Sequence, residues 1–242
     1  MIKLIISDLD GTLLKSGESE VNENLISIIK NLKKKNIEFA VASGRTYGEL
    51  RKILGNLEDI YYVCCDGGAV IYNEEVLYKR EIDAFAVRRL YNVKNIVYHS
   101  PEMSYFICAD EDLKKKLFDN YGNKVKKTEI FEDLKEIVKI SKYGAAFAEL
   151  PPFCCEVYKD KEWCDWISNN SGKGKATEFL QRHLNIEMKE TAAFGDNFND
   201  MGMLARASYK YVMKNAPEKV KMITCKRVEN IETEILKLSD MK

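Results

Sequence analysis

The N-terminal stretch reads Ile2-Lys3-Leu4-Ile5-Ile6-Ser7-Asp8-Leu9-Asp10-Gly11-Thr12, an apolar run that ends in two carboxylates. Residues 2–6 predict a short buried strand, and side chains two residues apart on a strand point to the same face. We therefore expect Asp8 and Asp10 side by side just past the end of that strand, where Gly11 permits a sharp turn. Two carboxylates this close repel each other unless a cation binds or one of them holds a proton. Mg²⁺ takes oxygen ligands, and a protonated carboxyl beside an ionised one separates an acid from a nucleophile.

Strand and helix patterns alternate on both sides of a central region. Before it, apolar spacing predicts helices at 21–36 and 47–57 and buried strands at 37–42 and 60–65. After it, the pattern predicts helices at 173–184, 201–207 and 231–238 and strands at 191–194 and 209–213. This rhythm is typical of an α/β fold with a Rossmann-like, doubly wound parallel sheet. Small polar residues follow the strands, at the sheet edge where such folds bind ligands.

The central region has a different rhythm. Strands are predicted at 96–98, 105–109, 144–150 and 153–158, and helices at 111–121 and 132–140. Adjacent strands with two helices between them predict an α+β unit with an antiparallel sheet. The sequence therefore predicts a core made of residues 1–79 and 168–242, with an inserted α/β cap domain at 80–167.

The composition excludes some classes of protein. Lys and Arg together number 38, as do Asp and Glu, so the net charge is zero and electrostatic binding to nucleic acid is not expected. The first apolar run is too short for a signal peptide or a membrane span. Seven cysteines, an odd number without a CxxC pair, and two histidines argue against a disulfide framework and a zinc site. We expect a reduced cytoplasmic protein.

Asp8-Leu9-Asp10-Gly11-Thr12 resembles the DxDGT signature of the haloacid dehalogenase-like superfamily, most of whose members are Mg²⁺-dependent phosphohydrolases. An acidic turn after a strand is the simpler interpretation of this pentapeptide alone. A calcium-binding loop does not fit, because Leu14 and Lys15 stand where ligands are required.

Three further stretches match the superfamily pattern in order, and each has a simpler interpretation. Ser43, with Gly44, resembles the second motif, whose hydroxyl binds the phosphoryl group; otherwise it caps a helix. Lys173 resembles the lysine of the third motif, although Lys175 is a rival and a solvated lysine is the simpler interpretation. A Walker P-loop is excluded there, since Ala176 follows Lys175. Gly195-Asp196-Asn197-Phe198-Asn199-Asp200 resembles the fourth motif, GDxxND, which otherwise caps the next helix.

The resemblance extends over the whole chain, because a large cap between the second and third motifs is the layout of Cof-like phosphatases. Val212-Met213-Lys214-Asn215-Ala216-Pro217 also resembles a stretch of that group. One departure is Asp66-Gly67-Gly68-Ala69, where the group usually carries Asn-Gly-Ala. The added carboxylate either alters the preference for the leaving group or caps a turn, and we favour the turn.

The resemblance implies a phosphatase that hydrolyses small phosphomonoesters (a sugar phosphate, a nucleotide or a phosphorylated cofactor) through an aspartyl-phosphate. Asp8 is the implied nucleophile and Asp10 the acid and base. Mg²⁺ is expected on Asp8, Asp196 and the backbone carbonyl of Asp10. Phosphate is expected at Leu9, Ser43, Gly44, Lys173 and Asn199, and Asp200 supports Lys173 or a metal-bound water.

Two alternatives stay open at this point. A sugar phosphomutase of the same superfamily shares the aspartyl-phosphate, and a non-catalytic binding protein shares the scaffold. The substrate is expected to be chosen by the cap, whose aromatic residues either contact it or pack in the core: Tyr105, Phe106, Phe147, Phe153, Tyr158, Trp163 and Trp166. The sequence leaves the oligomeric state undetermined.

Overall fold

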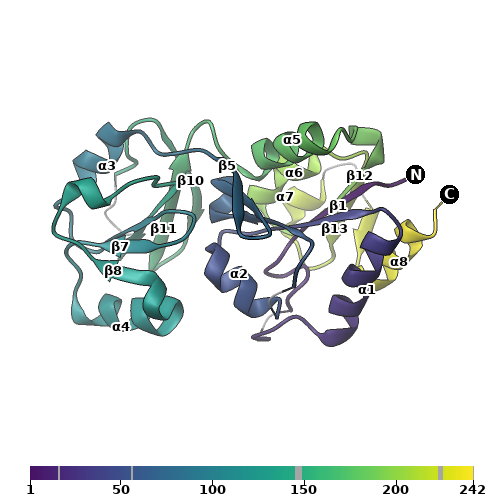
Figure 1. Cartoon of the computed structure of the whole chain (residues 1–242), viewed down its shortest axis with the longest axis horizontal. Coiled ribbons are helices and arrows are strands. Elements are labelled where there is room, and N and C mark those ends of the chain that lie inside the picture. Colours follow the sequence, from purple (N-terminus) through teal and green to yellow (C-terminus); the bar gives the residue numbers. More distant parts are fainter. Residues whose placement is uncertain (16, 56, 145–148, 223–225, 242) are drawn as a thin grey trace.

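The structure is a computed structural model that describes residues 1–15, 17–55, 57–144, 149–222 and 226–241. Two sheets lie next to each other along the longest axis (Figure 1). Within these residues the first sheet has eight strands: β1 (Leu4–Asp8), β2 (Glu38–Ala42), β3 (Tyr61–Cys64), β4 (Ala69–Tyr72), β5 (Glu75–Lys79), β12 (Thr191–Gly195), β13 (Tyr209–Met213) and β14 (Lys226–Val228).

The first sheet has the order β14-β13-β12-β1-β2-β3-β4-β5. The six strands from β14 to β3 run parallel, and β4 and β5 extend the sheet as antiparallel neighbours. The second half of the chain therefore supplies one side of β1 and the first half the other. Asp8, at the end of β1, lies opposite Ala42 at the end of β2.

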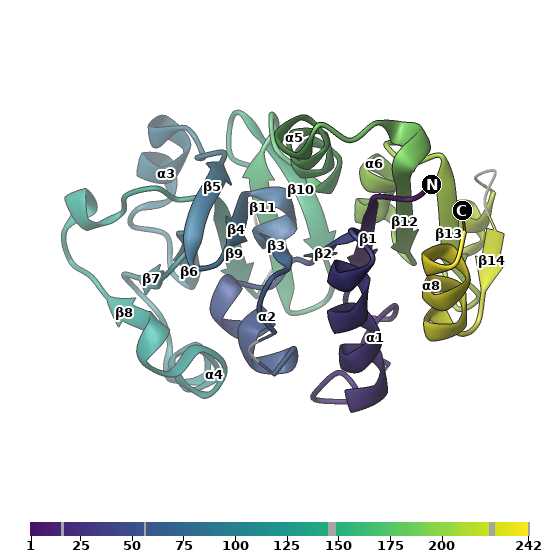
Figure 2. The same cartoon turned by 45° about the vertical axis from the view of Figure 1, so that its right-hand side comes forward.

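Helices cover both faces of this sheet: α1 (Glu23–Lys34), α2 (Tyr47–Ile53) and α8 (Ile231–Ser239) on one, and α5 (Lys173–Leu184), α6 (Met201–Leu204) and α7 (Glu218–Lys221) on the other. Helix α1 buries Leu25, Ile28, Ile29 and Leu32, which are the four residues on the predicted apolar stripe. Helices α1 and α8 lie side by side (Figure 2). The predicted α/β fold with a doubly wound, Rossmann-like sheet is confirmed.

The second sheet is formed by β6 (Ile96–His99), β7 (Ser104–Phe106), β8 (Val125–Lys127), β9 (Lys139–Tyr143), β10 (Cys154–Lys159) and β11 (Trp163–Ser168), in the order β10-β11-β9-β6-β7-β8. Its pairs are antiparallel except β7 with β8. Helix α3 (Ala84–Leu90) packs on one face with Ile140 and Trp166, and α4 (Glu111–Tyr121) packs on the other with Val97 and Phe106. The buried residues of this second cluster come from α4, β6, β7 and β8, and from β9 and β11 only Tyr143 and Trp163 pack against it.

Two predictions for this region need correction. The helix expected at 132–140 is wrong, because the residues form a short 3₁₀ turn (Phe131–Asp133) and then enter β9. Glu136 has a φ of 56°, a left-handed conformation that an α-helix does not tolerate. The strand expected at 144–150 falls partly on 145–148, outside the described residues, and Gly144, Glu149 and Leu150 lie outside strands. The pattern also missed α3, β8, β11 and the β4–β5 hairpin.

The domain division at 80–167 stays a prediction, although the second sheet lies wholly between Ile96 and Ser168. Among the described residues, each helix is too short or too polar to cross a lipid bilayer. The described cysteines, Cys64, Cys65, Cys108, Cys154, Cys155 and Cys164, form no disulfide.

Candidate active site

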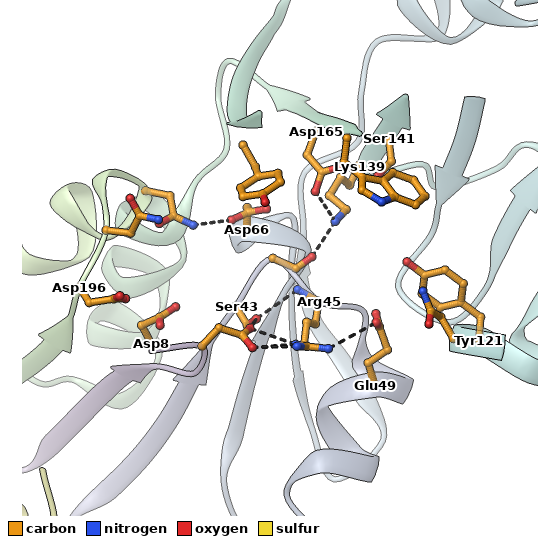
Figure 3. Close-up of a pocket in the computed structure, with 17 residues that line it drawn as sticks. Asp8, Ser43, Arg45, Glu49, Asp66, Tyr121, Lys139, Ser141, Asp165 and Asp196 are labelled. Atoms are coloured by element: carbon orange, nitrogen blue, oxygen red, sulfur yellow. Dashed lines mark hydrogen bonds and ion pairs between the residues drawn. The ribbon is translucent and has the colours of Figure 1, made fainter. Parts of the chain in front are cut away.

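The sheet register gathers the polar residues that follow β1, β2 and β12. Because these strands are parallel neighbours, their carboxyl ends meet at one edge of the sheet. Asp8 ends β1, Ser43 follows β2 and Asp196 follows β12. All three side chains line one cavity (Figure 3).

A buried lysine lies beneath this edge. The Nζ atom of Lys173, at the first residue of α5, donates to Asp8 Oδ1 at 2.5 Å and to Asp200 Oδ1 at 2.6 Å. The other oxygen of Asp200 accepts the backbone N–H groups of Asp196 and Asn197 at 2.9 and 3.0 Å. Burial alone would lower the pKa of Lys173, but Asp200 and Asp8 outweigh it and the net shift is upward. The lysine is therefore a fixed cation, and it holds one oxygen of Asp8 in place.

Three carboxylates stand close enough to share a metal ion. Ligand atoms of Asp8, Asp196 and Asp200 lie within 4.8 Å of one another. Burial raises the pKa of Asp8 well above its usual value, partly opposed by Lys173. Burial and then the charge of Asp200 raise the pKa of Asp196 to about 6. Crowded carboxylates of this kind are stabilised by a divalent cation.

A carboxylate oxygen without a hydrogen-bond partner is available to bind a cation. Asp8 Oδ2 is buried and has no hydrogen-bond partner among the described residues, whereas both oxygens of Asp200 are engaged. Gly11 gives Asp196 room, because a Cβ on Gly11 would lie 2.4 Å from Asp196 Oδ2. The residues present therefore fit a hard divalent cation bound by Asp8 and Asp196. Whether Mg²⁺ is that ion stays a prediction.

Asp10 is held by Arg45 and Ser43, whereas Asp8 is held by Lys173. Arg45 donates to both its oxygens, with Nη2 at 2.8 Å from Oδ1 and Nε at 3.0 Å from Oδ2. Ser43 Oγ donates to Asp10 Oδ2 at 3.3 Å and accepts the N–H of Arg45 at 3.2 Å. The side chain of Asp10 is thus outside the three-carboxylate cluster. No role was predicted for Arg45 from the sequence.

Asp66 and Asn199, predicted separately, contact each other. Asn199 Nδ2 donates to Asp66 Oδ1 at 2.9 Å, and Asp66 Oδ2 has no partner within the described part of the chain. Asp66 is 2% exposed and has a φ of 55°. The expectation that its side chain caps a turn is therefore wrong. Burial raises its pKa, opposed by Lys139 and Lys173.

The cavity has a volume of about 450 Å³ and lies between the two sheets. Its far side is lined by polar and aromatic residues of β9, β10 and β11: Lys139, Ser141, Tyr158, Trp163 and Asp165. Sequence reasoning missed Lys139, Ser141 and Asp165. The available signal was their alternation with the apolar residues Ile140, Cys164 and Trp166, which is the period of a strand with one polar face.

The remaining predicted residues fall into two groups. Leu9 is fully buried, so only its backbone can face a phosphate, and the carbonyl of Gly44 accepts a hydrogen bond from Lys139. Of the aromatic residues expected in a cap, Tyr158 and Trp163 line the cavity, Phe106 and Trp166 are buried, and Phe153 is exposed. Tyr105 packs against the core of the second sheet, and Phe147 lies outside the described residues.

The chain is similar to known proteins both in sequence and in fold. A sequence model of the family described as haloacid dehalogenase-like hydrolase matches residues 5–232. The 5-amino-6-(5-phospho-D-ribitylamino)uracil phosphatase YbjI of Escherichia coli (strain K12) is 26% identical, with 89% of this chain and 86% of that protein covered. A protein of Eubacterium rectale has a TM-score of 0.86 at 23% identity, with 98% of each chain covered. A phosphatase from Bacteroides thetaiotaomicron has a TM-score of 0.81 at 20% identity, with 98% of this chain and 95% of that chain covered.

Proposed function

Because the chain belongs to the haloacid dehalogenase-like hydrolase family, we propose that it hydrolyses small phosphomonoesters with Mg²⁺ through an aspartyl-phosphate on Asp8. The family, and the enzyme class of phosphoric monoester hydrolase, agree with the prediction from sequence. The observation that carries the proposal is the state of Asp8. Asp8 lines the cavity, one of its oxygens is fixed by Lys173, and the other is buried without a hydrogen-bond partner in the described structure.

The proposed first step is an in-line attack by a carboxylate oxygen of Asp8 on phosphorus. The P–O bond to the leaving group breaks, and the departing oxygen takes a proton from Asp10. In the second step Asp10 removes a proton from water, whose oxygen displaces Asp8 from phosphorus and releases phosphate. A carboxylate suits the first role because, once ionised, it is a nucleophile that needs no base.

Asp10 can carry a proton only when Arg45 releases at least one of its oxygens, since the guanidinium now donates to both. We propose that the bound phosphoryl group competes for Arg45. That competition would leave Asp10 free to serve as the acid.

Asp8, Asp196 and the backbone carbonyl of Asp10 would hold Mg²⁺, while Asp200 keeps Lys173 in position. A bound divalent cation supplies charge neutralisation between the carboxylate and the phosphate. Ser43, the backbone at Leu9 and Gly44, Lys173 and Asn199 are the proposed phosphate contacts. Asn199 would have to leave Asp66 to take that role.

We propose that residues 80–167 act as the cap that selects a small phosphorylated metabolite in the cytoplasm. The E. coli relative is named for a phosphorylated ribitylamino compound, so a phosphorylated polyol is a sensible first member of a substrate panel. Phosphate release compared with isomer formation on one sugar phosphate would distinguish the phosphatase from a phosphomutase.

The test is Asp8→Asn, which keeps the shape of the side chain and removes the nucleophile. Mg²⁺-dependent release of phosphate should fall by at least about 10⁴-fold with the far-UV spectrum unchanged. Asp119→Asn, at an exposed position of α4, is the matched control and should retain activity. Undiminished hydrolysis by pure Asp8→Asn protein would falsify the assignment of the nucleophile.

A further inference from the structure

A buried lysine of the second sheet reaches the turn that carries Ser43. Lys139 opens β9 and is 5% exposed. Its Nζ atom donates to the carbonyl oxygen of Gly44 at 2.7 Å and to Asp165 Oδ2 at 2.9 Å (Figure 3). One contact is with the neighbouring strand β11, and the other crosses from the second sheet to the first.

The ion pair with Asp165 explains why a charge can be buried here, but it does not explain the second contact. Ser141 pairs directly with Asp165, so Lys139 and Asp165 are diagonal neighbours on one face of the sheet. An ion pair confined to the second sheet would satisfy both charges. Lys139 keeps that ion pair and also donates to a backbone oxygen beside the proposed phosphate position.

That backbone oxygen belongs to a peptide unit held at both ends. The Gly44 carbonyl and the Arg45 N–H lie in one planar peptide group. Its oxygen accepts from Lys139, and its N–H donates to Ser43 Oγ at 3.2 Å. Rotation of this peptide would remove both contacts together. Lys139 therefore fixes the donor that orients the hydroxyl of Ser43.

We infer that Lys139 is a positioning residue that holds the Ser43–Arg45 turn ready for phosphate and makes phosphate binding depend on contact between the two sheets. This inference rests on the proposed function only in taking Ser43 as a phosphate contact. A residue that acts through Ser43 should affect all phosphomonoesters equally, whereas one that touches the leaving group should discriminate among them.

The test compares Lys139→Met with Lys142→Met. Lys142 lies on the same strand, and its ammonium donates to the carbonyl of Tyr143, away from the cavity. Lys139→Met should raise the inhibition constant of inorganic phosphate by about tenfold and lower kcat/KM by the same factor for p-nitrophenyl phosphate and for a sugar phosphate. Lys142→Met should leave these values unchanged. Equal values for the two variants, or a loss confined to one substrate, would overturn the inference.

A double-mutant cycle with Ser43→Ala tests whether Lys139 acts through Ser43. In the Ser43→Ala background, Lys139→Met should change phosphate affinity less than twofold, because its target is already gone. The same tenfold loss in both backgrounds would contradict the inference.

A second variant separates loss of the Gly44 contact from misfolding. Lys139→Met leaves Asp165 buried without its cation, so Lys139→Met with Asp165→Asn is made in parallel. Asp165→Asn alone should retain phosphate affinity, because Lys139 keeps its contact with Gly44. The double variant should lose affinity, and equal affinities for the two would count against the inference.

The failure of the proposed function is distinguishable from the failure of this inference. Phosphate binding is also read from the phosphate-dependent rise in Tm, which needs no turnover. An inactive wild-type protein would contradict the proposed function, whereas the Tm comparison would still decide the role of Lys139.

Discussion

Asp196 carries a charge that its surroundings disfavour, and a bound cation would relieve it. Burial and the charge of Asp200 raise the pKa of Asp196 to about 6, above its usual value of about 3.9. The unfolded chain therefore releases this proton at lower pH than the folded chain. The cost to stability grows as the pH rises from about 4 to 6 and is constant above that range.

Asp196→Asn removes this cost and should raise the metal-free stability at pH 8. We expect a gain on the order of 1 kcal/mol, after allowance for solvent screening of a partly exposed group. Mg²⁺ should raise the Tm of the wild type but not that of the variant. Urea unfolding and Tm measurements at pH 8, in EDTA and in Mg²⁺, check both effects. A variant that is less stable in EDTA, or that still responds to Mg²⁺, would contradict the assignment of Asp196.

At the residue scale, the sequence predicted which polar side chains follow the strands, but it did not predict which residues those side chains contact. Asp8, Ser43 and Asp196 were identifiable because each follows an apolar run, and parallel strands bring such ends together. The sequence did not reveal the contact of Lys139 with Gly44 or that of Asn199 with Asp66, because each contact joins residues far apart in the sequence. Such contacts depend on how the loops and the two sheets pack against each other, which local sequence patterns do not predict.

At the element scale, the helix expected at 132–140 ran into the first two residues of β9. Its residues Lys139-Ile140-Ser141-Lys142-Tyr143 follow a run of charged and apolar residues that fits helical spacing loosely. Pairing with β6 and β11 decides the outcome, because Ile140 enters the core on one face while Lys139 and Ser141 face the cavity. By contrast, α4 and α5 were predicted with their observed limits, since Asp110 caps α4 and Gly172 precedes α5.

His99, on β6, should make the stability of the protein depend on pH. Its ring nitrogens contact Ser104 Oγ at 2.8 Å and Ser141 Oγ at 3.0 Å. Burial, and then the charge of Lys139, holds its pKa well below 6.5 in the folded state. As the pH falls, the imidazole of His99 is protonated in the unfolded chain before it is protonated in the folded one. The contribution of neutral His99 to the free energy of unfolding is therefore complete above about pH 6.5 and is lost as the pH falls below that value.

His99→Gln should flatten the dependence of unfolding free energy on pH between about 6.5 and 5, by at most about 1.4 kcal/mol per pH unit. Urea unfolding at several pH values measures the slope. His183→Gln replaces the other histidine, which is exposed on α5, and should keep the slope of the wild type. Parallel slopes for the wild type and His99→Gln would show that His99 is not the group that titrates.

For the whole molecule, the two parts of the chain that build the first sheet also contact each other at Gly67, in the turn after β3. A Cβ on Gly67 would lie 2.3 Å from the carbonyl carbon of Gly172 and 2.6 Å from the backbone nitrogen of Lys173. Ser171 Oγ donates to the carbonyl of Gly67 at 3.0 Å. The turn after β3 therefore supports the start of α5, where the lysine beneath the carboxylates begins. The doubly wound architecture was predictable from the alternation of strands and helices, but this junction was not.

Gly67→Ala should lower both stability and activity by more than Gly17→Ala does. The two glycines have φ values of +87° and +89°, but no described atom lies within 4 Å of a Cβ placed on Gly17. Gly17→Ala thus reports the cost of the backbone conformation, about 1–2 kcal/mol. Gly67→Ala adds the clash with Gly172 and should also reduce kcat/KM by displacing Lys173. Equal losses of Tm and of activity in the two variants would show that the junction tolerates a methyl group.

The position of β1 between β12 and β2 has a consequence for synthesis on the ribosome. Strand β1 is synthesised before β12, and one edge of β1 has no partner until Thr191–Gly195 has left the exit tunnel. The second sheet, whose strands are contiguous in the chain, can assemble before that moment. A nascent polypeptide that stops short of Asp196 would therefore carry the proposed nucleophile without one of its proposed metal ligands, so we expect no turnover of phosphate esters before β12 has been synthesised.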